Sequence, residues 1–146
     1  MYWSFAGGYA VLGGLSLAIG VAIVNALEQC GVQGVQLKWP NDIYAQGKKL
    51  AGVLIEVEGQ MGAECQTVVG IGLNVSLPDK VDEITQPWTD LSSLCEQPVD
   101  RNKMASALID ELYKSLVLFE NSGLNGFIEQ WRALDIYANK PVKLII

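Results

Sequence analysis

The stretch "LKWPNDIYAQGKKLAG", residues 37–52, predicts two strand connections in quick succession. Apolar and polar residues alternate over 35–39, which is the period-two pattern of a strand with one buried face. Pro40 ends that strand because it has no N–H to give to a neighbouring strand. Residues 43–45 can form a second short strand, and residues 46–48 then make a tight hairpin connection. The stretch therefore predicts the corner of a β-sheet.

Longer strands are expected on either side of this corner. Downstream, Leu50–Val57 and Cys65–Val75 are rich in the apolar and β-branched residues that favour strands, and Gly59–Glu64 supplies a turn between them. Upstream, Tyr2–Phe5 can form another strand. Short connections join antiparallel neighbours, because a parallel pair needs a longer crossover. The sequence therefore predicts a sheet of antiparallel neighbours.

Helices are expected before and after these strands. A mostly apolar helix runs from about Gly14 to Cys30 and follows a glycine-rich connection. Asp100 is a good N-cap for a second helix, which finishes before Gly123. Its apolar residues follow helical spacing: Met104, Leu108, Leu112, Leu116 and Phe119. A shorter helix over 127–134 completes the set.

The remaining segments carry weaker patterns. Residues 76–99 contain several prolines and are expected to be mostly loop, with one or two helical turns around 90–96. The closing "KPVKLII", residues 140–146, has the alternating start of a strand. A chain of 146 residues suits a single domain with its own core.

The composition excludes several classes of function. A net charge of −6, with only 10 Lys and Arg, argues against binding to a nucleic-acid backbone. The chain has no histidine, so an imidazole base and a His-ligated metal are both excluded. Cys30, Cys65 and Cys95 lack any C-x-x-C spacing and are expected to be free, buried thiols. Such thiols fit a reducing compartment, so we expect a cytoplasmic protein.

The uncharged opening run, residues 1–27, is long enough in principle to cross a bilayer. Several glycines, Ser16 and Asn25 interrupt it, and no Lys or Arg before Lys38 sets an orientation. A secretory signal is not expected either, because the basic n-region is absent. We therefore expect a strand, a glycine-rich connection and a buried helix, with no membrane association.

Polar side chains and bare backbone gather at three places among the expected strands. These are Lys38 with Asn41 and Asp42, Lys48-Lys49 before Gly52, and "GIGLN", Gly70 to Asn74. Singly, the lysines could be solvated strand or turn residues, and the aspartate could bond only to the turn backbone. A purely structural explanation is weaker for the glycines inside strands, because such glycines usually mark close approach by a ligand or another backbone. If the strands are neighbours, two ammonium groups and a carboxylate converge beside a glycine-floored groove. Such a groove suits a ligand that is neutral at one end and anionic at the other.

The motifs "KWPND", "KKLAGVLIE" and "GIGLN", in this order and at these separations, closely resemble the catalytic domain of bacterial biotin protein ligases (biotin–[acetyl-CoA-carboxylase] ligases). The match runs from "GLSLAIG" to "NKPVKLII", through essentially the whole chain. The resemblance implies an α+β fold, with a mixed, largely antiparallel sheet flanked by helices as in class II aminoacyl-tRNA synthetases. Residues 1–138 would be part of the catalytic domain, and 139–146 the first strand of a small C-terminal β-domain.

The resemblance also implies a two-step reaction. Biotin and Mg-ATP first give biotinyl-5′-AMP and pyrophosphate, and a lysine of a biotin carboxyl carrier domain then attacks the adenylate. The implied small molecules are therefore biotin, ATP and Mg²⁺. The implied partners are a biotin carboxyl carrier protein and, through sheet-mediated dimerisation, a second copy of the chain.

The same resemblance assigns roles to residues of this sequence. Lys49 would contact the biotin carboxylate and the α-phosphate, Lys38 would help to hold the phosphates, and Asp42 would assist Mg²⁺ or carboxylate positioning. Asn41 and Asn74 would lie on the nucleotide side. The biotin ring pocket would be lined by Gly52, Leu54, Gly70 and Gly72.

The sequence also departs from the family pattern. Family members carry, upstream of this region, a Gly-Arg-Gly-Arg type loop over the adenylate, whereas the arginines here are Arg101 and Arg132. A DNA-binding winged helix is not found either, so we expect a fragment that lacks the N-terminal part and has no repressor activity. Two alternatives remain open: a non-catalytic biotin-binding or dimerising relic, and a lipoate ligase of the same fold, which "KWPND" and "GIGLN" fit less well.

Overall fold

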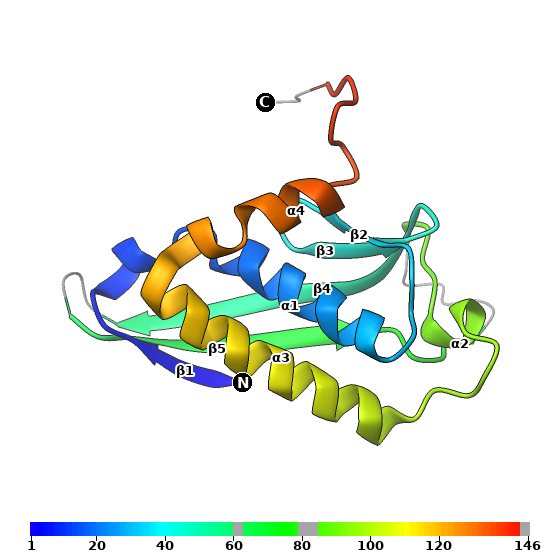
Figure 1. Ribbon diagram of the computed structural model, residues 1–146, viewed down its shortest axis with the longest axis horizontal. Helices are drawn as coiled ribbons and strands as arrows, with labels where there is room; N and C mark the ends of the chain where they lie inside the picture. The colour runs from blue at the N-terminus through cyan, green and yellow to red at the C-terminus, as the bar shows by residue number, and fades with distance from the viewer. Residues whose placement is uncertain (60–62, 79–84, 144–146) are drawn as a thin grey trace.

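The computed structural model describes residues 1–59, 63–78 and 85–143 (Figure 1). Its sheet contains β1 (Tyr2–Phe5), β2 (Val35–Lys38), β3 (Asp42–Ala45), β4 (Lys48–Gly59) and β5 (Cys65–Leu73). The strand order is β1-β5-β4-β3-β2, and every neighbouring pair is antiparallel. Among the described residues, parallel pairing is confined to isolated bridges from Leu37 to Asp135 and from Lys49 to Trp88. The expected α+β fold with a largely antiparallel sheet is confirmed.

Helices gather on one face of this sheet (Figure 1). The α-helices are α1 (Leu15–Gln29), α2 (Leu91–Leu94), α3 (Arg101–Ser122) and α4 (Ile128–Leu134), and the 3-10 helices are η1 (Gly8–Leu12) and η2 (Gly123–Gly126). Helix α1 lies directly against the sheet, α3 packs on α1, and α4 contacts both α1 and β2. The helices expected from about Gly14, from Asp100 and over 127–134 are confirmed.

Helix α1 forms the centre of the core. Ile19, Ile23 and Leu27 are completely buried, which explains why this helix is apolar on most of its surface. The chain turns immediately after the helix at Gly31, whose φ of 88° is the left-handed conformation that glycine accepts most readily. Within the described residues, none of the helices has the length and apolar character needed to traverse a bilayer. The uncharged opening run is instead a strand, a 3-10 turn and this core helix.

The hairpin between β3 and β4 is set by two residues, Gln46 and Gly47. Both have positive φ, 51° and 75°. Two-residue connections of this kind match the right-handed twist of the strands that they join, which makes them the favoured hairpin turns. The turn brings Lys48 and Lys49 to the start of β4, directly beside β3.

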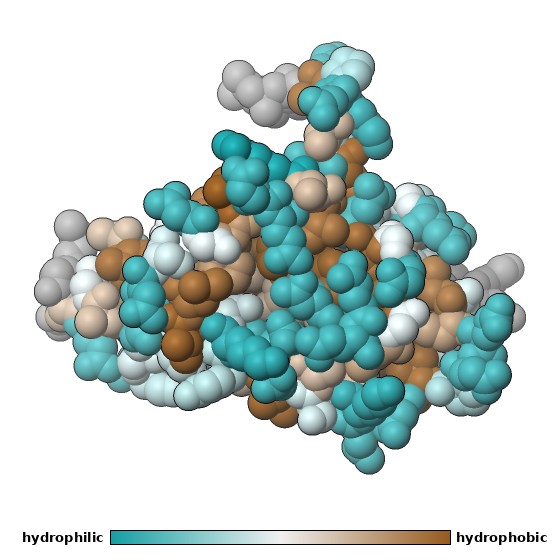
Figure 2. All heavy atoms as spheres, viewed as in Figure 1, coloured by the Kyte–Doolittle hydropathy of each residue, from teal (hydrophilic) through white to brown (hydrophobic). Residues whose placement is uncertain are grey.

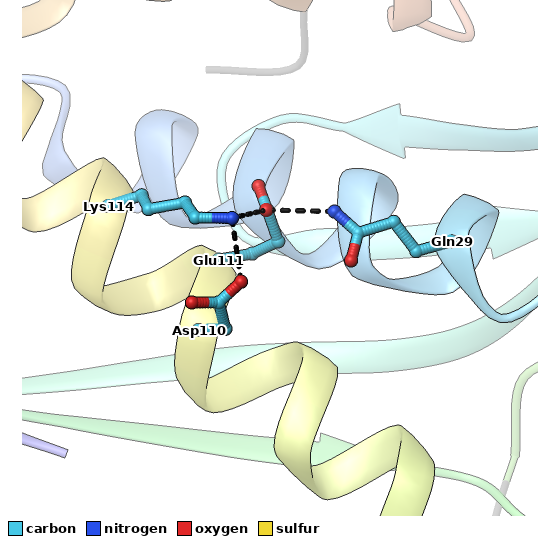
Figure 3. A network of polar contacts seen from close by, with 4 residues as sticks. All are labelled: Gln29, Asp110, Glu111 and Lys114. Carbon is cyan, nitrogen blue, oxygen red and sulfur yellow. Dashed lines mark hydrogen bonds and ion pairs between the residues drawn. The ribbon is translucent and has the colours of Figure 1, made fainter.

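Polar contacts also tie α3 to α1 (Figure 3). The largely buried Glu111 accepts a hydrogen bond of 2.8 Å from Gln29 Nε2, and its Oε1 lies 3.1 Å from Lys114 Nζ. Lys114 also pairs with Asp110 at 2.6 Å, and these hydrogen bonds raise the pKa of Lys114. The buried carboxylate is therefore satisfied from both helices, which favours one fixed packing of α3 on α1.

The helix side of the molecule is largely hydrophilic, and its exposed apolar side chains form separate patches (Figure 2). This view agrees with the one-sided pattern of α3, which buries Met104, Leu112, Leu116 and Phe119 and turns its charged residues other than Glu111 outward. The opposite face of the sheet has a different character and carries the residues discussed below.

Two expectations need correction or remain open. The strand expected over 139–146 is not seen in residues 139–143, which form turns and extended chain projecting away from the body (Figure 1), and residues 144–146 lie outside the described part. The domain boundary after residue 138 stays a prediction. The three cysteines are free as expected, but burial was predicted wrongly for two of them. Cys65 is buried, whereas Cys30 and Cys95 follow the ends of α1 and α2, where side chains reach the surface.

Candidate active site

Four of the residues singled out in the sequence form a row across four strands. Lys38 of β2 pairs with Asp42 of β3, Asp42 pairs with Gly52 of β4, and Gly52 pairs with Gly72 of β5. We call these four residues the cross-sheet row. Their neighbours along each strand point into the core, so the row lies on the face away from the helices. Strand pairing thus gathers residues that are spread over more than thirty positions in the sequence.

A β-bulge brings Lys49 to the same face as the row. Strict alternation would place Lys49 and Gly52 on opposite faces of β4, because they are an odd number of residues apart. The register against β3 shifts by one residue here, so that Leu50 is the extra residue. Leu50 and Ala51 are both buried, at 0% and 2% exposure. Lys49 is therefore returned to the open face, and a Cβ built at Gly52 would lie 3.5 Å from Lys49 Nζ.

Lys49 forms an ion pair with Asp42 directly above Gly52. Lys49 Nζ lies 2.7 Å from Asp42 Oδ1, and the two side chains are only 27% and 18% exposed. A Cβ at Gly52 would also lie 3.5 Å from Asp42 Oδ1. Partial shielding from water strengthens such a pair relative to a fully exposed one. The carboxylate therefore holds the ammonium group in one place at the edge of the glycine floor.

Lys38 has a different partner, Tyr44, which the sequence analysis did not identify. Lys38 Nζ donates a hydrogen bond of 3.3 Å to the Tyr44 hydroxyl and lies 5.1 Å from the centroid of its ring. This hydrogen bond raises the pKa of Lys38 above its usual value, with a smaller contribution from the charge of Asp42. Lys38 is thus a second fixed cation beside the ion pair. Tyr44 lies two residues after Asp42 on β3, so period-two spacing could have placed it on the same face.

Gly70 and Gly72 provide a floor on which the described residues leave open space. A Cβ at Gly72 would meet no heavy atom within 4 Å, and a Cβ at Gly70 would come no closer than 3.6 Å to the Leu54 carbonyl oxygen. Neither glycine has a positive φ, so the backbone does not require glycine at these positions. Gly70 pairs with Leu54, whose side chain is 64% exposed beside it. The bare backbone is therefore available to a flat or narrow ligand, as expected from the sequence.

The two asparagines expected on the nucleotide side use their amide nitrogens within the protein. Asn41 Nδ2 donates to the Val53 carbonyl at 2.8 Å, and Val53 N donates back to the Asn41 carbonyl at 2.9 Å. Asn74 Nδ2 donates to the Thr89 carbonyl at 3.0 Å. Both asparagines therefore fix local backbone next to the row, and contact with a nucleotide stays a prediction.

A segment expected to be loop builds a wall beside Lys49. Lys49 N donates to the Pro87 carbonyl at 3.0 Å, and Thr89 N donates to the Lys49 carbonyl at 2.9 Å, so Trp88 runs parallel to β4. A cleft of about 160 Å³ opens at this place. Its lining residues are Lys49, Ala51, Gly72, Asn74, Gln86 and Trp88. The signal that could have marked this wall is a tryptophan in an otherwise polar, proline-containing segment.

The row does not form a metal site by itself. In the described part of the chain, no three His, Cys, Asp or Glu residues cluster closely enough to hold a metal ion. Asp42 brings a single carboxylate, and one of its oxygens already contacts the Lys49 ammonium. Mg²⁺ usually needs one or two carboxylates together with phosphate oxygens of a substrate. The observed geometry therefore fits Asp42 better as the partner of Lys49 than as a resident metal ligand.

The family assignment comes from residues 7–74. These residues match the model of the biotin/lipoate A/B protein ligase family. Residues 7–74 belong to this family. The matched range contains the whole cross-sheet row together with Lys49, Leu54 and Gly70. The resemblance expected from the three ordered motifs is thus confirmed.

Individual ligases are also similar to this chain in sequence. The bifunctional ligase/repressor BirA of Escherichia coli is 42% identical over 148 residues, which cover 100% of this chain and 46% of BirA. The biotin–[acetyl-CoA-carboxylase] ligase of Mycobacterium tuberculosis is 40% identical over 114 residues, covering 75% of this chain and 40% of that ligase. The chain therefore spans less than half the length of these two relatives.

A solved ligase structure confirms the fold. The biotin protein ligase of Aquifex aeolicus in complex with biotin and ATP is 29% identical and has a TM-score of 0.74. The match covers 93% of this chain and 58% of the Aquifex chain. The shared architecture includes the helices and the antiparallel sheet. The sheet carries the row.

A prediction follows from the environment of Lys38. Replacing Tyr44 by Phe removes the acceptor that raises the pKa of Lys38, so the lysine should lose its proton at a lower pH than in the parent chain. In the parent, the stability contributed by this contact is present below the unfolded-state pKa of about 10.4 and is lost as the pH rises through the higher folded-state pKa. An NMR titration of the Lys38 side chain measures the shift. Tyr113→Phe, on α3, is the control, and an unchanged Lys38 titration in Tyr44→Phe would contradict the assignment.

Proposed function

We propose that this chain carries the biotin-activating site of a biotin protein ligase. It would join biotin to ATP to give biotinyl-5′-AMP, and the biotinyl group would then pass to a lysine of a biotin carboxyl carrier protein. The observation that carries the proposal is the Lys49–Asp42 ion pair, held above the Gly52–Gly72 floor within the residues that match the family. The Aquifex relative, solved with biotin and ATP, supports this choice of substrates.

The first step brings two anions together. A carboxylate oxygen of biotin would attack the α-phosphorus of ATP, a new oxygen–phosphorus bond would form, and the bond to the β-phosphate bridge would break to release pyrophosphate. Both reactants are negative, so a fixed cation at their meeting point lowers the barrier. Lys49 would supply this cation, oriented by Asp42, and Lys38 would add a second positive charge. A carboxylate needs no base to deprotonate it near neutral pH, which agrees with a chain that has no histidine.

The floor would accept the neutral part of the substrate. From Lys49, the open face of the sheet continues over the Gly52–Gly72 pair of β4 and β5 to the Leu54–Gly70 pair. Bare backbone lets the bicyclic ring of biotin lie against the sheet, and the exposed Leu54 side chain offers an apolar contact. The charged end of biotin would then point towards Lys49. This arrangement would hold the carboxylate oxygen of biotin near the α-phosphorus and beside a positive charge. Orientation and charge stabilisation are the main sources of rate acceleration in such a transfer.

The second step would transfer the biotinyl group. The neutral amine of the acceptor lysine would attack the acyl carbon of the adenylate, an amide bond would form, and AMP would leave with the bridging oxygen while the nitrogen loses a proton. Lys49 and Lys38 would also stabilise the negative charge on the phosphate of the departing AMP in this second step. Mg²⁺ would enter as part of the Mg-ATP substrate and offset phosphate charge. The open face of the sheet, away from the helices, leaves room for the acceptor to approach.

The central test replaces Lys49 by Ala. Loss of the cation that faces the transition state should lower the rate of biotinyl-5′-AMP formation by roughly a hundredfold or more. Mass spectrometry of the purified chain incubated with biotin and Mg-ATP measures the adenylate. Lys48→Ala is the matched control, because Lys48 is the neighbouring lysine of the same hairpin but is exposed and lacks the pair with Asp42.

The outcomes separate the alternatives. Adenylate formed equally well by Lys49→Ala would contradict the role of this residue. If the parent chain binds biotin in a calorimetric titration but forms no adenylate, the chain is a binding relic of the fold. Preference for lipoate over biotin would instead favour the lipoate branch of the family.

A second variant tests the floor. Gly72→Ala adds a methyl group where the protein leaves open space, so the fold should tolerate it. A ligand lying on the floor would meet this methyl group, and biotin affinity should fall by about tenfold or more, the usual effect of one misplaced methyl(ene) group in a fitted pocket. Gly13→Ala is the control, because Gly13 also has open space for a Cβ but lies outside the row. Equal biotin affinity in the two variants would rule out the floor as the ring site.

We further propose that the chain forms a homodimer through an edge of its sheet. The outermost strands β1 and β2 each have one side without a strand partner in the described residues, and such edges favour association. Residue Ile136 already donates to the Leu37 carbonyl on the outer side of β2, which leaves less of that edge open. Light scattering over a range of concentrations should show a dimer. A monomer at every concentration would exclude this part of the proposal.

A further inference from the structure

Asp90 lies buried at the end of the segment that walls the Lys49 cleft. Only 3% of its surface is exposed. Its Oδ1 accepts hydrogen bonds from Ser93 N at 2.9 Å and from Ser93 Oγ at 2.7 Å, while its Oδ2 accepts one from Leu77 N at 2.7 Å. The two oxygens of one carboxylate thus bind two separate parts of the chain, one after β5 and one in α2.

These bonds fix the wall from the side opposite to Lys49. Immediately before Asp90, Thr89 N and the Pro87 carbonyl bond to the backbone of Lys49. The wall segment is therefore held on one side by β4 and on the other by the Asp90 carboxylate. A backbone hydrogen bond of 3.0 Å from Leu91 N to the Asn74 carbonyl also joins this segment to the chain just after β5. Trp88 lies between Pro87 and Thr89, the two residues that bond to the Lys49 backbone.

A second aspartate shows that capping alone does not need this arrangement. Asp100 caps α3 with a single oxygen, Oδ1, which accepts from Asn102 N at 2.9 Å and Lys103 N at 3.1 Å. Asp100 is exposed, whereas Asp90 is buried. Burying a carboxylate is costly unless its oxygens are hydrogen-bonded. The additional bond to Leu77 therefore points to a requirement for position beyond helix capping.

The protonation state of Asp90 agrees with this role. Burial alone would raise the pKa of Asp90, but the hydrogen bonds from Ser93 and from the Leu77 backbone outweigh it, so the pKa lies below its usual value. The side chain is therefore a carboxylate with both oxygens available as acceptors near neutral pH. The stability that it contributes is present above the unfolded-state pKa of about 3.9 and is lost as the pH falls through the lower folded-state pKa.

We propose that Asp90 is a positioning residue for the active site: by joining Leu77 to Ser93 it holds the Trp88 wall against Lys49, and this sets the affinity for the adenylate. The inference rests on the proposed function for its ligand, but its structural part concerns the cleft alone. The cleft shares Lys49, Gly72 and Asn74 with the site, so a displaced wall would change the space beside the reacting groups. Asp90 itself touches no lining residue through its side-chain bonds.

The test uses Asp90→Asn in the full chain. An amide has a single acceptor oxygen, so it cannot serve both Leu77 and Ser93. Amide hydrogen exchange at Thr89 and Lys49 should become about tenfold faster, because opening of the wall exposes these two N–H groups. Affinity for a non-hydrolysable biotinyl-AMP analogue should fall by about tenfold, or about 1.4 kcal/mol.

Matched variants separate positioning from general stability. Asp100→Asn alters the other aspartate cap, and it should leave exchange at Thr89 and Lys49 and the affinity for the analogue unchanged. Asp90→Ser is the second variant should Asp90→Asn fail to fold, because serine also caps helices but its one hydroxyl oxygen cannot serve both partners. It should reproduce both effects of Asp90→Asn.

Each outcome decides part of the account. Exchange at Thr89 and Lys49 that equals the parent rate in the Asp90 variants overturns the proposal. Faster exchange with unchanged affinity for the analogue overturns the link between the wall and the ligand. If the parent chain binds no analogue, the proposed function fails and the link to the ligand fails with it, while the exchange rates still decide whether Asp90 holds the wall.

Discussion

The extra residue of the β-bulge, Leu50, determines to which face of the sheet the Lys49 side chain points. In a regular strand, Lys49 would face the side of the sheet that α1 covers, where a lysine ammonium would have to be buried. The bulge turns Leu50 and Ala51 together into the core and returns Lys49 to the open face, within reach of Asp42. The burial of two consecutive apolar residues stabilises this irregularity, since each removes apolar surface from water. The position of the cation thus depends on the same core packing that stabilises the fold.

The one-sided arrangement of the helices explains why the site can exist at all. Because α1 and α4 contact the same face of the sheet, the other face carries glycines, the charged residues Lys38, Asp42 and Lys49, and the exposed Leu54. The Lys49–Asp42 ion pair lies over Gly52, whereas no heavy atom of the described residues lies within 4 Å of a Cβ built at Gly72. We therefore propose that the bare backbone beside this pair is the binding surface. The fixed charges lie at one end of this surface and the apolar contact lies towards the other. A substrate with a neutral ring and an anionic tail matches this order.

Local sequence patterns predicted the strands and the central residues of the site for a physical reason. Alternation over 35–39, the Gln46-Gly47 turn and the paired glycines of "GIGLN" are each properties of a few neighbouring residues, and antiparallel neighbours then bring them into register. Period-two spacing could have placed Tyr44 on the face of Asp42, but the contacts of Tyr44 with Lys38 and of Trp88 with Lys49 form only in the folded chain. Asn41 was expected to lie on the nucleotide side; its amide nitrogen bonds to β4, a contact that only the folded turn makes, and a contact with the nucleotide stays a prediction. The strand expected at the end of the chain followed alternation over 140–146 and the resemblance, and residues 140–143 form no strand in the structure.

The central claim is that the open sheet face around the cross-sheet row is the ligand site. It is tested most directly by mapping amide chemical shifts while the chain is titrated with a non-hydrolysable biotinyl-AMP analogue. The account predicts saturable shifts at Lys49, Gly52, Gly70 and Gly72, with α3 unaffected. Shifts concentrated on α3, or no saturable shift on β4 and β5, would contradict it.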